Sequence, residues 1–396
     1  MRDRARSRLL LIALIAALAV VVAACGEDDE GAEEAAANGD WPSQEEVVAD
    51  IDDVVAQFED GELEYDDGAD SDEVIEALQD VIPQPDDGFP ERSIEWIVPW
   101  GEGGGSDNYA RHIGHDAERI FGESIVYNNM PGASGEVGLG HLFTQAADGY
   151  TIYGAIANQT INDALGIQPY NFVDDSAFVI RNQGATEIYW VAEDSQFETF
   201  EEMLDYAVDN PGDVILSGSG IGSDDEFRML SLENELDTEF GFVPFDGVGE
   251  RTSALLGGDV DVLHETAGTI FDLYEDGQIR PLAYGGDIVF EDIDPDIPSV
   301  ADLGYEVPIG RWRGVTTLED VDQQIIDYMH NVFYAAAQLP FYTEYEVEFF
   351  QHVAGGYLNS EEFEAEAQRE REQVEALIEE LDYDTGAVEE ELEEEE

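Results

Sequence analysis

Four short loops rich in glycine and small polar residues are the parts of this sequence best suited to chemistry. Each follows an apolar, strand-like run: GEGGGSDN after IEWIVPW, ANQTIND after TIYGAI, SGSGIGSDD after DVIL, and FDGVGE after FGFVP. Glycine lets the backbone approach a ligand closely, and a helix that begins in such a loop presents unpaired N–H groups that favour anions. In open α/β sheets, ligands bind beyond the carboxyl ends of strands. We therefore expect these loops to bind a small anion such as a carboxylate.

Known phosphate and nucleophile motifs do not fit these loops. GEGGGSDN lacks the Lys-Ser or Lys-Thr of a P-loop, and no GxGxxG fingerprint follows the first strand, so nucleotide binding is disfavoured. A Gly-x-Ser-x-Gly elbow is absent, as is a paired cysteine and histidine. The sequence thus predicts a binding protein without a cofactor, and it leaves open the plainer alternative that the glycines only make turns.

Three further side chains near the first loop have simple alternatives to a functional role. Asp107 can cap a helix that begins near Asn108, which we favour over a ligand contact. His112 and His115 lie three residues apart on that helix and could share a metal ion, but the sequence marks no third ligand. We therefore expect solvated histidines and no metal site.

Strand-like runs and helical patterns alternate along the chain in two series. The first has strands at 94–98, 124–127 and 150–155, helices at 109–121 and 136–147, and then a polar loop. The second has strands at 187–191, 213–217, 241–244 and 260–263 and helices at 199–208, 224–236 and 250–256. Such alternation predicts an α/β fold with parallel sheets, here in two lobes with a cleft between them.

Other segments flank this α/β region. A capping box of Ser43 and Glu46 opens a helical N-terminal extension, expected over 41–90. An amphipathic helical stretch covers 361–381, and residues 382–396 form an acidic tail that we expect to be disordered. The role of the extension cannot be assigned from the sequence.

The N-terminus is typical of an exported protein. Four separate arginines precede an apolar run at 9–22, which predicts a signal peptide over 1–24 rather than a twin-arginine signal. Cys25, the one cysteine of the chain, follows small residues as in the cleavage and lipidation box of bacterial lipoproteins. We expect lipidation at Cys25, an acidic tether over 25–40 and an extracytoplasmic location. The alternative is an uncleaved signal anchor.

The charge balance is extreme. The 396 residues carry 94 acidic and 15 basic side chains, a formal net charge of -79, and every basic residue is arginine. This composition is typical of a halophile, and it disfavours a nucleic acid partner because no basic face could meet the phosphates.

Stability should therefore depend on salt. In dilute buffer the acidic surface repels itself, whereas near 1 M salt the Debye length falls to roughly 3 Å and carboxylates are screened from one another. We expect the melting temperature to fall steeply as NaCl is removed, measured by circular dichroism. A melting temperature that does not change with NaCl would contradict the halophilic interpretation.

Longer stretches resemble a known receptor family. RSIEWIVPWGEGGGSDNYAR, VYNNMPGASGEVGLGHLFTQAADGYTIYGA, VPFDGVGERTSALLGGDVDVL and GQIRPLAYGG are similar in order and motif to the solute-binding receptors of tripartite tricarboxylate transporters, the Bug or TctC family. IGRWRGV resembles the family's return strand. The resemblance covers residues 92–381 and implies a type II periplasmic-binding-protein fold, with one lobe at 92–190 plus 310–381 and the other at 191–309, joined by crossing strands.

The resemblance also implies a ligand site at the facing loops of the two lobes. Family members hold a carboxylate mainly through main-chain N–H groups and ordered water, and Glu265 stands where many relatives have an aspartate that meets a polar or amino group. Carried over by position, the other site residues are Gly103, Gly104, Gly105, Ser106, Asp107, Ala157 and Asn158 in the first lobe and Gly220, Ile221, Gly222 and Ser223 in the second.

Some residues depart from the family pattern. Asp246 replaces a common lysine, and Asp224 and Asp225 stand where serine is frequent. These acids could repel a trianion or favour a ligand with a cationic group. Arg311 and Arg313 are the nearest candidate counter-charges, and surface ion pairs are the alternative role for both.

Together, these features predict a monomeric, membrane-tethered lipoprotein that captures a di- or tricarboxylate for the membrane components of a tripartite tricarboxylate transporter. A receptor that presents its ligand to a sensor kinase is an alternative, and a hydrolase is a more distant one.

Overall fold

The computed structural model describes residues 41–66, 68, 72–166, 170–185, 187–220, 222–245, 247–286, 293–305, 310–352, 354–381 and 383. The chain divides into two compact units, Met1–Pro42 and Ser43–Glu396, and all the helices and strands below belong to the second. The expectations for the signal peptide, Cys25, the tether, Ile221, Asp246 and residues 384–396 lie outside the described residues.

The first sheet has five strands in the order β2-β1-β3-β10-β4. Their bounds are β1 Ile94–Val98, β2 Ile125–Asn129, β3 Thr151–Ile156, β4 Ser176–Ala185 and β10 Arg311–Leu318. β1 runs parallel to β2 and β3, but β10 runs antiparallel to β3 and β4. The expectation of parallel sheets is therefore met only in part, because β10 returns from the second lobe and enters this sheet in the opposite direction.

The second sheet is also mixed, with the order β7-β6-β8-β5-β9. Its strands are β5 Glu187–Ala192, β6 Ile215–Gly218, β7 Gly241–Pro244, β8 Val262–Thr266 and β9 Ile279–Tyr284. β5 pairs antiparallel with β8 and β9. The first lobe therefore ends before Glu187 and not at residue 190, because β5 hydrogen-bonds to the second sheet along its whole length.

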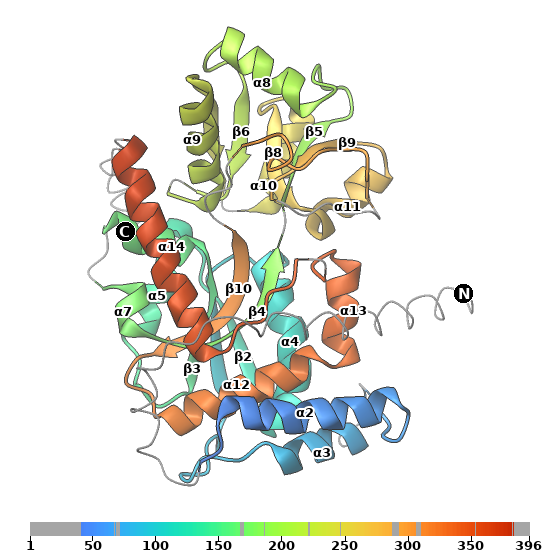
Figure 1. The fold of residues 1–396 in the computed structure, drawn as a ribbon, viewed down its shortest axis with the longest axis vertical. Coiled ribbons are helices and arrows are strands. Elements are labelled where there is room, and N and C mark those ends of the chain that lie inside the picture. The colour runs from blue at the N-terminus through green and yellow to red at the C-terminus, as the bar shows by residue number, and fades with distance from the viewer. Residues whose placement is uncertain are drawn as a thin grey trace. The chain divides into compact units, whose positions relative to one another are not determined.

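Helices cover both sheets (Figure 1). They are α4 Gly105–Phe121, α5 Glu136–Leu142, α6 Asn158–Leu165, α7 Phe172–Asp175, α8 Phe200–Asp209, α9 Asp224–Leu236, α10 Val248–Gly257, α11 Ala267–Glu275, α12 Gln323–Ala337, α13 Pro340–Glu348 and α14 Ser360–Leu381.

The stretch ANQTIND was expected to be a loop but forms most of α6. Two of its polar side chains bond to the backbone next to the helix start: Gln159 Oε1 accepts from the amide of Ile156 (2.9 Å), and Thr160 Oγ1 donates to the carbonyl of Ala157 (2.7 Å).

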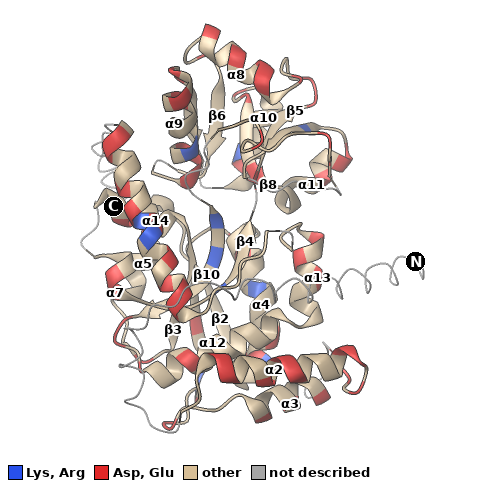
Figure 2. Cartoon of the chain, viewed as in Figure 1, with Lys and Arg blue, Asp and Glu red and all other residues tan. Residues whose placement is uncertain are grey.

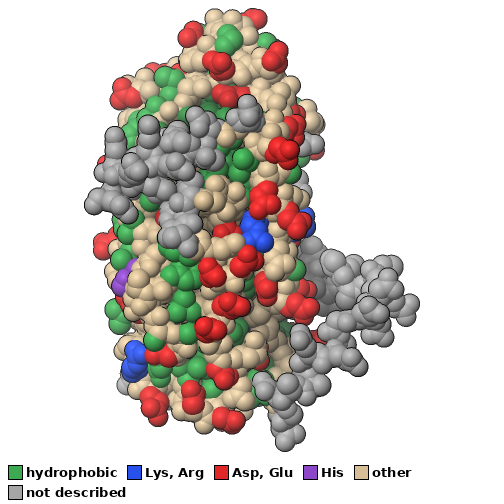
Figure 3. Space-filling model, turned by 90° about the vertical axis from the view of Figure 1, so that its left-hand side faces the viewer, with side chains coloured by type: hydrophobic (Ala, Val, Ile, Leu, Met, Phe, Trp, Pro, Cys, Tyr) green, Lys and Arg blue, Asp and Glu red, His purple; other side chains and the backbone are tan. Residues whose placement is uncertain are grey.

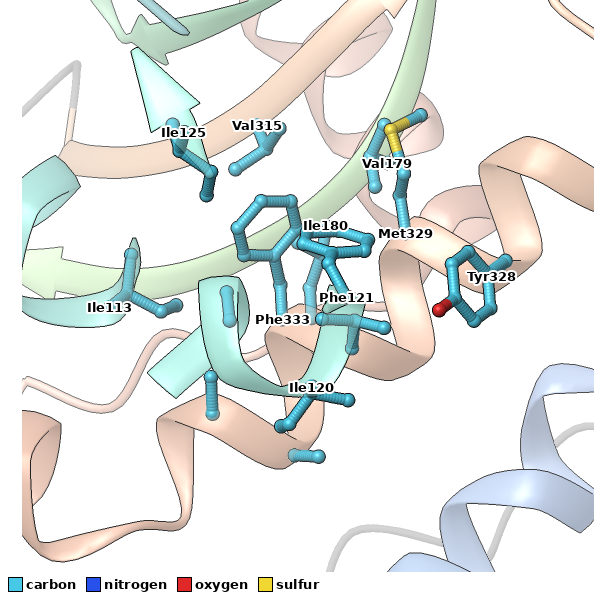
Figure 4. Packing of buried hydrophobic residues seen from close by; sticks show 14 of the residues in the cluster. Ile113, Ile120, Phe121, Ile125, Val179, Ile180, Val315, Tyr328, Met329 and Phe333 are labelled. Atoms are coloured by element: carbon cyan, nitrogen blue, oxygen red, sulfur yellow. The ribbon is translucent and has the colours of Figure 1, made fainter. Parts of the chain in front are cut away.

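The N-terminal extension is part of the core of the first lobe. Its helices α2 Gln44–Glu59 and α3 Glu73–Val81 contribute to a hydrophobic cluster that also contains residues of α4, α12 and the first sheet. Figure 4 shows the centre of this cluster, where Phe121 of α4 lies near Phe333 of α12. The predicted capping box of Ser43 and Glu46 is confirmed. The extension thus stabilises the lobe that carries the first glycine loop.

The described surface is strongly acidic. Where the face in Figure 3 is not covered by grey atoms, it shows many acidic side chains and few basic ones, and Figure 2 shows basic residues on β10. Among the described residues, no helix combines the length and apolar character needed to cross a membrane. The few arginines in the interior therefore need individual explanation.

α14 brings a buried carboxyl group against the return strand. Trp312 Nε1 of β10 donates to Glu370 Oε2 (2.7 Å), and burial raises the pKa of Glu370 from its ordinary value of 4.5 to about 7. Between pH 4.5 and about 7, Glu370 holds a proton in the folded protein that it has released in the unfolded chain. The free energy of unfolding therefore falls as the pH rises through this range.

Glu370→Gln should remove this pH dependence. Compared with the wild type, we expect the variant to be more stable by about 3 kcal/mol at pH 8 and little changed at pH 4.5, because the amide oxygen can still accept from Trp312. Urea unfolding at both pH values in high salt measures this difference. Glu372→Gln, at an exposed position of the same helix, should show no such gain, and a gain of the same size in both variants would contradict the assignment.

Candidate functional site

Residues of both lobes line a cavity of about 90 Å³. The first lobe contributes the loop between β1 and α4, the end of β3 and the start of β10. The second lobe contributes the end of β6, the first turns of α10 and α11 and the end of β8. The lining residues are Trp100, Gly101, Glu102, Gly104, Gly105, Ser106, Ile156, Ser219, Gly247, Val248, Arg251, Glu265, Thr269, Arg311 and Arg313.

Two helices begin at this cavity with glycine caps. α4 starts after Gly104 and α10 after Gly247, and no side chain of a described residue caps either helix. The first amides of a helix have no partner within the helix, and its N-terminus carries a partial positive charge. The two lobes therefore both offer backbone donors for an anion.

Arg313 is a buried cation with no counter-charge in the described part of the chain. Its side chain is on β10 and the residue is only 4% exposed. Nη1 donates to Gln183 Oε1 (2.5 Å), Nε has no partner, and within the described part of the chain no carboxylate lies within 4.0 Å. A side-chain carbon at Gly105 would collide with Nη2, so the guanidinium lies directly against the first turn of α4. A buried, uncompensated charge is costly, and an anion in the cavity would offset that cost.

Arg311, two residues earlier, is fully compensated. Its Nε and Nη2 atoms donate to the two carboxylate oxygens of Asp224 at 3.0 and 2.9 Å, and Nη1 contacts Glu187. Asp225 lies 3.3 Å from Nη2. Asp224 and Asp225 belong to α9 of the second lobe, so these ion pairs join the return strand of the first sheet to the second lobe. Arg311 therefore has a structural role, although it reaches the cavity wall.

The Arg251–Glu265 pair forms a neutral part of the cavity wall. Arg251 Nη2 donates to Glu265 Oε2 (2.7 Å), while the backbone amide and hydroxyl of Thr266 donate to Oε1 at 2.8 and 3.0 Å. Glu265 was expected to meet a polar or amino group of the ligand. In this arrangement both of its oxygens already accept hydrogen bonds from the protein.

Glu187, Asp225 and His264 come close enough to share a metal ion, since each offers one ligand atom within 4.8 Å of the others. All three are buried, and His264 Nδ1 lies 2.9 Å from Asp225 Oδ1. Burial alone would raise the pKa of Asp225, but Arg311 and His264 hold it well below its usual range. Burial raises the pKa of Glu187 to about 7. Because Arg311 contacts both carboxylates, we interpret this cluster as an ion-pair network.

The two histidines of α4 make aromatic contacts. His112 stacks on Tyr345 with ring centroids 4.2 Å apart, and His115 stacks on Phe341 at 3.8 Å. Both are partly buried, and not solvated as expected. Their packing against α13 explains their presence without a metal.

The cavity brings together five of the site residues expected from the sequence: Gly104, Gly105, Ser106, Glu265 and Arg313. The others in the described part of the chain do not line it: Gly103, Asp107, Ala157, Asn158, Gly220, Gly222 and Ser223. Ser223 caps α9, and Asn158 is fully buried with no hydrogen-bond partner for its amide among the described residues. The sequence missed Gly247 and Val248 as site residues, although the FDGVGE loop that contains them was one of the four original glycine loops.

Asp107 is neither the N-cap nor a cavity residue. Gly104 is the N-cap, and α4 begins four residues earlier than expected. The Asp107 carboxylate accepts from the Gly103 amide (2.9 Å), from Asn129 (3.0 Å) and from Arg111 (2.9 Å). These contacts hold its pKa below the usual value although burial acts in the opposite direction. Asp107 thus fixes the shape of the glycine loop.

The two lobes touch beside the cavity. A side-chain carbon at Gly220 of the second lobe would lie 2.5 Å from Ser134 Oγ of the first. Residues 132–135 all have positive φ angles, from 48° to 127°, in the turn that brings Ser134 there. Such backbone strain persists only where surrounding contacts hold it, so the PGASG motif forms a defined interlobe contact.

The family model and the curated relatives that match this chain belong to one family of receptors. The family model described as "Tripartite tricarboxylate transporter family receptor" matches residues 109–383. A curated relative, "UPF0065 protein in gbd 5'region" of Cupriavidus necator, is 26% identical over 302 residues, which cover 74% of this chain and 89% of the relative. Protein BugT of Bordetella pertussis is 25% identical over 62% of this chain and 76% of its own length.

Solved structures share the fold. The periplasmic binding protein BugD superposes with a TM-score of 0.65 at 22% identity, over 74% of this chain and 98% of BugD. MatC from Rhodopseudomonas palustris with bound malate gives 0.65 at 20% identity over 73% of this chain and 100% of MatC. A further R. palustris protein with adipate gives 0.67 at 21% identity, over 74% of this chain and 98% of that one. These likenesses confirm the expected two-lobed binding-protein fold.

Proposed function

The chain belongs to the tripartite tricarboxylate transporter receptor family, and from this membership and the geometry of the cavity we propose that it is an extracytoplasmic receptor that captures a small di- or tricarboxylate for transport. The observation that carries the proposal is Arg313, a buried guanidinium with no carboxylate partner among the described residues, directly beside the uncapped start of α4. A ligand carboxylate is the group that would compensate it.

The charge of the site favours a dicarboxylate over a tricarboxylate. Arg313 supplies one full positive charge, and each of the two helix N-termini supplies roughly half a charge. Arg251 and Arg311 add nothing further because Glu265 and Asp224 already compensate them. These positive charges sum to about two, so a dianion is favoured over a trianion, and Glu102 of the lining would add to the repulsion of a third carboxylate.

Closure of the lobes explains how such a receptor works. One end of the ligand would bind the first turn of α4 with Arg313, and the other end would bind the first turn of α10 in the second lobe. A ligand that contacts both lobes binds the closed form more tightly and shifts the population toward it. The glycines at both helix starts let the ligand approach the amides closely.

The location and partners of the receptor are further parts of the proposal. Export by the 1–24 signal peptide and lipidation at Cys25 would tether a monomer to the outer face of the membrane, where it would deliver its ligand to the membrane components of a tripartite tricarboxylate transporter. A role in presenting ligand to a sensor kinase is compatible with the same site. A hydrolase does not fit a family of solute-binding receptors.

A ligand screen in high salt tests the proposed function. Malate, adipate and citrate should be added at above 1 M NaCl, with the melting temperature as the first readout and isothermal titration calorimetry as the second. A ligand present at a hundred times its Kd adds about 2.7 kcal/mol to the free energy of unfolding. We expect a dicarboxylate to raise the melting temperature more than citrate does. A protein that none of the carboxylates stabilises would contradict the proposal.

Gly104→Leu should weaken binding without unfolding the protein. Gly104 lines the cavity with an ordinary φ of -76°, so its backbone suits a side chain, although a side-chain carbon would lie 3.3 Å from the Gly101 carbonyl oxygen and the loop must shift slightly. The side chain would occupy part of the cavity of about 90 Å³. We expect at least a tenfold higher Kd for the best dicarboxylate, because the leucine side chain and the ligand would compete for the same space at a cost of about 1–3 kcal/mol. Without ligand, the melting temperature should be nearly unchanged. Gly257→Leu, at the exposed end of α10, is the matched control. Equal affinities in both variants would reject the loop as part of the site.

A further inference from the structure

We propose that Gln183 is the positioning residue that holds the guanidinium of Arg313 in place while leaving its charge available to the ligand. The inference rests on the proposed function, because it concerns how the carboxylate site is kept both ordered and positively charged. It assigns a role to a side chain of β4 that lies behind the cavity and does not line it.

The contact between the two residues follows from sheet register. Gln183 of β4 is the cross-strand partner of Arg313 of β10. Gln183 is fully buried, and its Oε1 atom accepts from Arg313 Nη1 at 2.5 Å. With Nη1 anchored there, Nη2 is held against Gly105 at the start of α4. The amide therefore sets where the guanidinium points.

The orientation of the Gln183 amide is fixed from the other side. Its Nε2 atom donates to Glu346 Oε1 and to the hydroxyl of Tyr342, both at 3.4 Å. An arginine can only donate hydrogen bonds, and the Glu346 oxygen accepts here, so only one amide orientation serves both neighbours. Residues of α13 thus turn the oxygen of Gln183 toward Arg313.

The neutral partner distinguishes Arg313 from the other arginines of the cavity. Arg251 donates to Glu265 at 2.7 Å and Arg311 to Asp224 at 2.9 Å, in a chain that has 94 acidic residues. A glutamate at position 183 would have the same shape and would bind Arg313 more strongly. It would also neutralise the cation, so a ligand carboxylate would lose its counter-charge.

Binding assays of three variants test this role, with malate and adipate as probes in high salt. Gln183→Glu should raise the Kd by about thirtyfold or more, because the new carboxylate competes with the ligand for Arg313. Gln183→Met keeps the charge of Arg313 but not its anchor, and should raise the Kd by less than about tenfold. Asn182→Asp makes the same amide-to-acid change on the adjacent residue of β4, where the side chain accepts from Tyr109 (2.9 Å), and should change the Kd by less than threefold.

A second measurement needs no ligand. In the wild-type background, Gln183→Glu should lower the melting temperature only slightly, because the new acid pairs with Arg313 although it gives up the hydrogen bond to Glu346. In the Arg313→Gln background, the same change leaves a buried acid without a partner and should lower the melting temperature by roughly 5 °C. Such a dependence of one change on the other is the signature of a direct pair.

The outcomes separate the two levels of the proposal. A wild-type protein that binds neither probe would overturn the proposed function. Wild-type binding together with unchanged binding by Gln183→Glu would overturn only the role of Gln183. The same conclusion would follow if Gln183→Met lost as much affinity as Gln183→Glu, or if Gln183→Glu lowered the melting temperature equally in both backgrounds, since Gln183 would then serve packing alone.

Discussion

Arg313→Gln is expected to raise the Kd for the bound dicarboxylate by about a hundredfold. The substitution removes the one cavity cation of the described chain that has no protein counter-charge. Hydrogen bonds to charged groups contribute about 1.5–3 kcal/mol each, and every 1.4 kcal/mol is a factor of ten in Kd. The amides of α4 and α10 remain, so we expect weak binding to persist.

Calorimetry with malate and adipate in high salt measures this loss, and Arg92→Gln is its matched control. Arg92 also carries one positive charge, but its side chain is 60% exposed and pairs with Asp148 on the surface. The control should bind like the wild type. Without ligand, the melting temperature of Arg313→Gln should be equal to or above that of the wild type, because a costly buried charge has been removed. An unchanged Kd for Arg313→Gln would remove the basis of the proposed site.

Local patterns in the sequence located most of the elements. The strand at β1 and the helix at α9 have the predicted bounds, because each is a periodic run between clear boundary residues. α6 was missed because its polar side chains are typical of a loop, whereas the fold buries them and some of them bond to nearby backbone. Burial of polar groups depends on tertiary contacts that no local pattern records.

The site could be predicted only in part, because it too depends on contacts between residues that are far apart in the sequence. Gly104, Gly105 and Ser106 were found because they lie in one contiguous motif. The distinction between Arg311 and Arg313 could not be made from the sequence, since both occur in the same strand. Their roles depend on partners far along the chain: Asp224 is 87 residues from Arg311, and Gln183 is 130 residues from Arg313.

Arg311→Gln should mainly cost stability, with an expected loss of about 3–5 kcal/mol in the free energy of unfolding. Arg311 compensates Asp224, Asp225 and Glu187, which are all buried, so its removal leaves several carboxylates close together without their main counter-charge. The pKa values of Asp225 and Glu187 in the folded state should rise, because Arg311 lowers both of them in the wild type. The loss should therefore be larger at pH 8 than at pH 5, because the carboxylates can take up protons at the lower pH.

Urea unfolding in high salt measures this loss, again with Arg92→Gln as the surface control, which we expect to cost less than about 1 kcal/mol. Adding Asp224→Asn to Arg311→Gln should recover part of the stability, since one of the uncompensated acids is then neutral. Two arginines on one strand would thus behave differently: the compensated one supports the fold and the uncompensated one binds the ligand. Full stability of Arg311→Gln together with loss of binding would reverse these roles and make Arg311 the ligand cation.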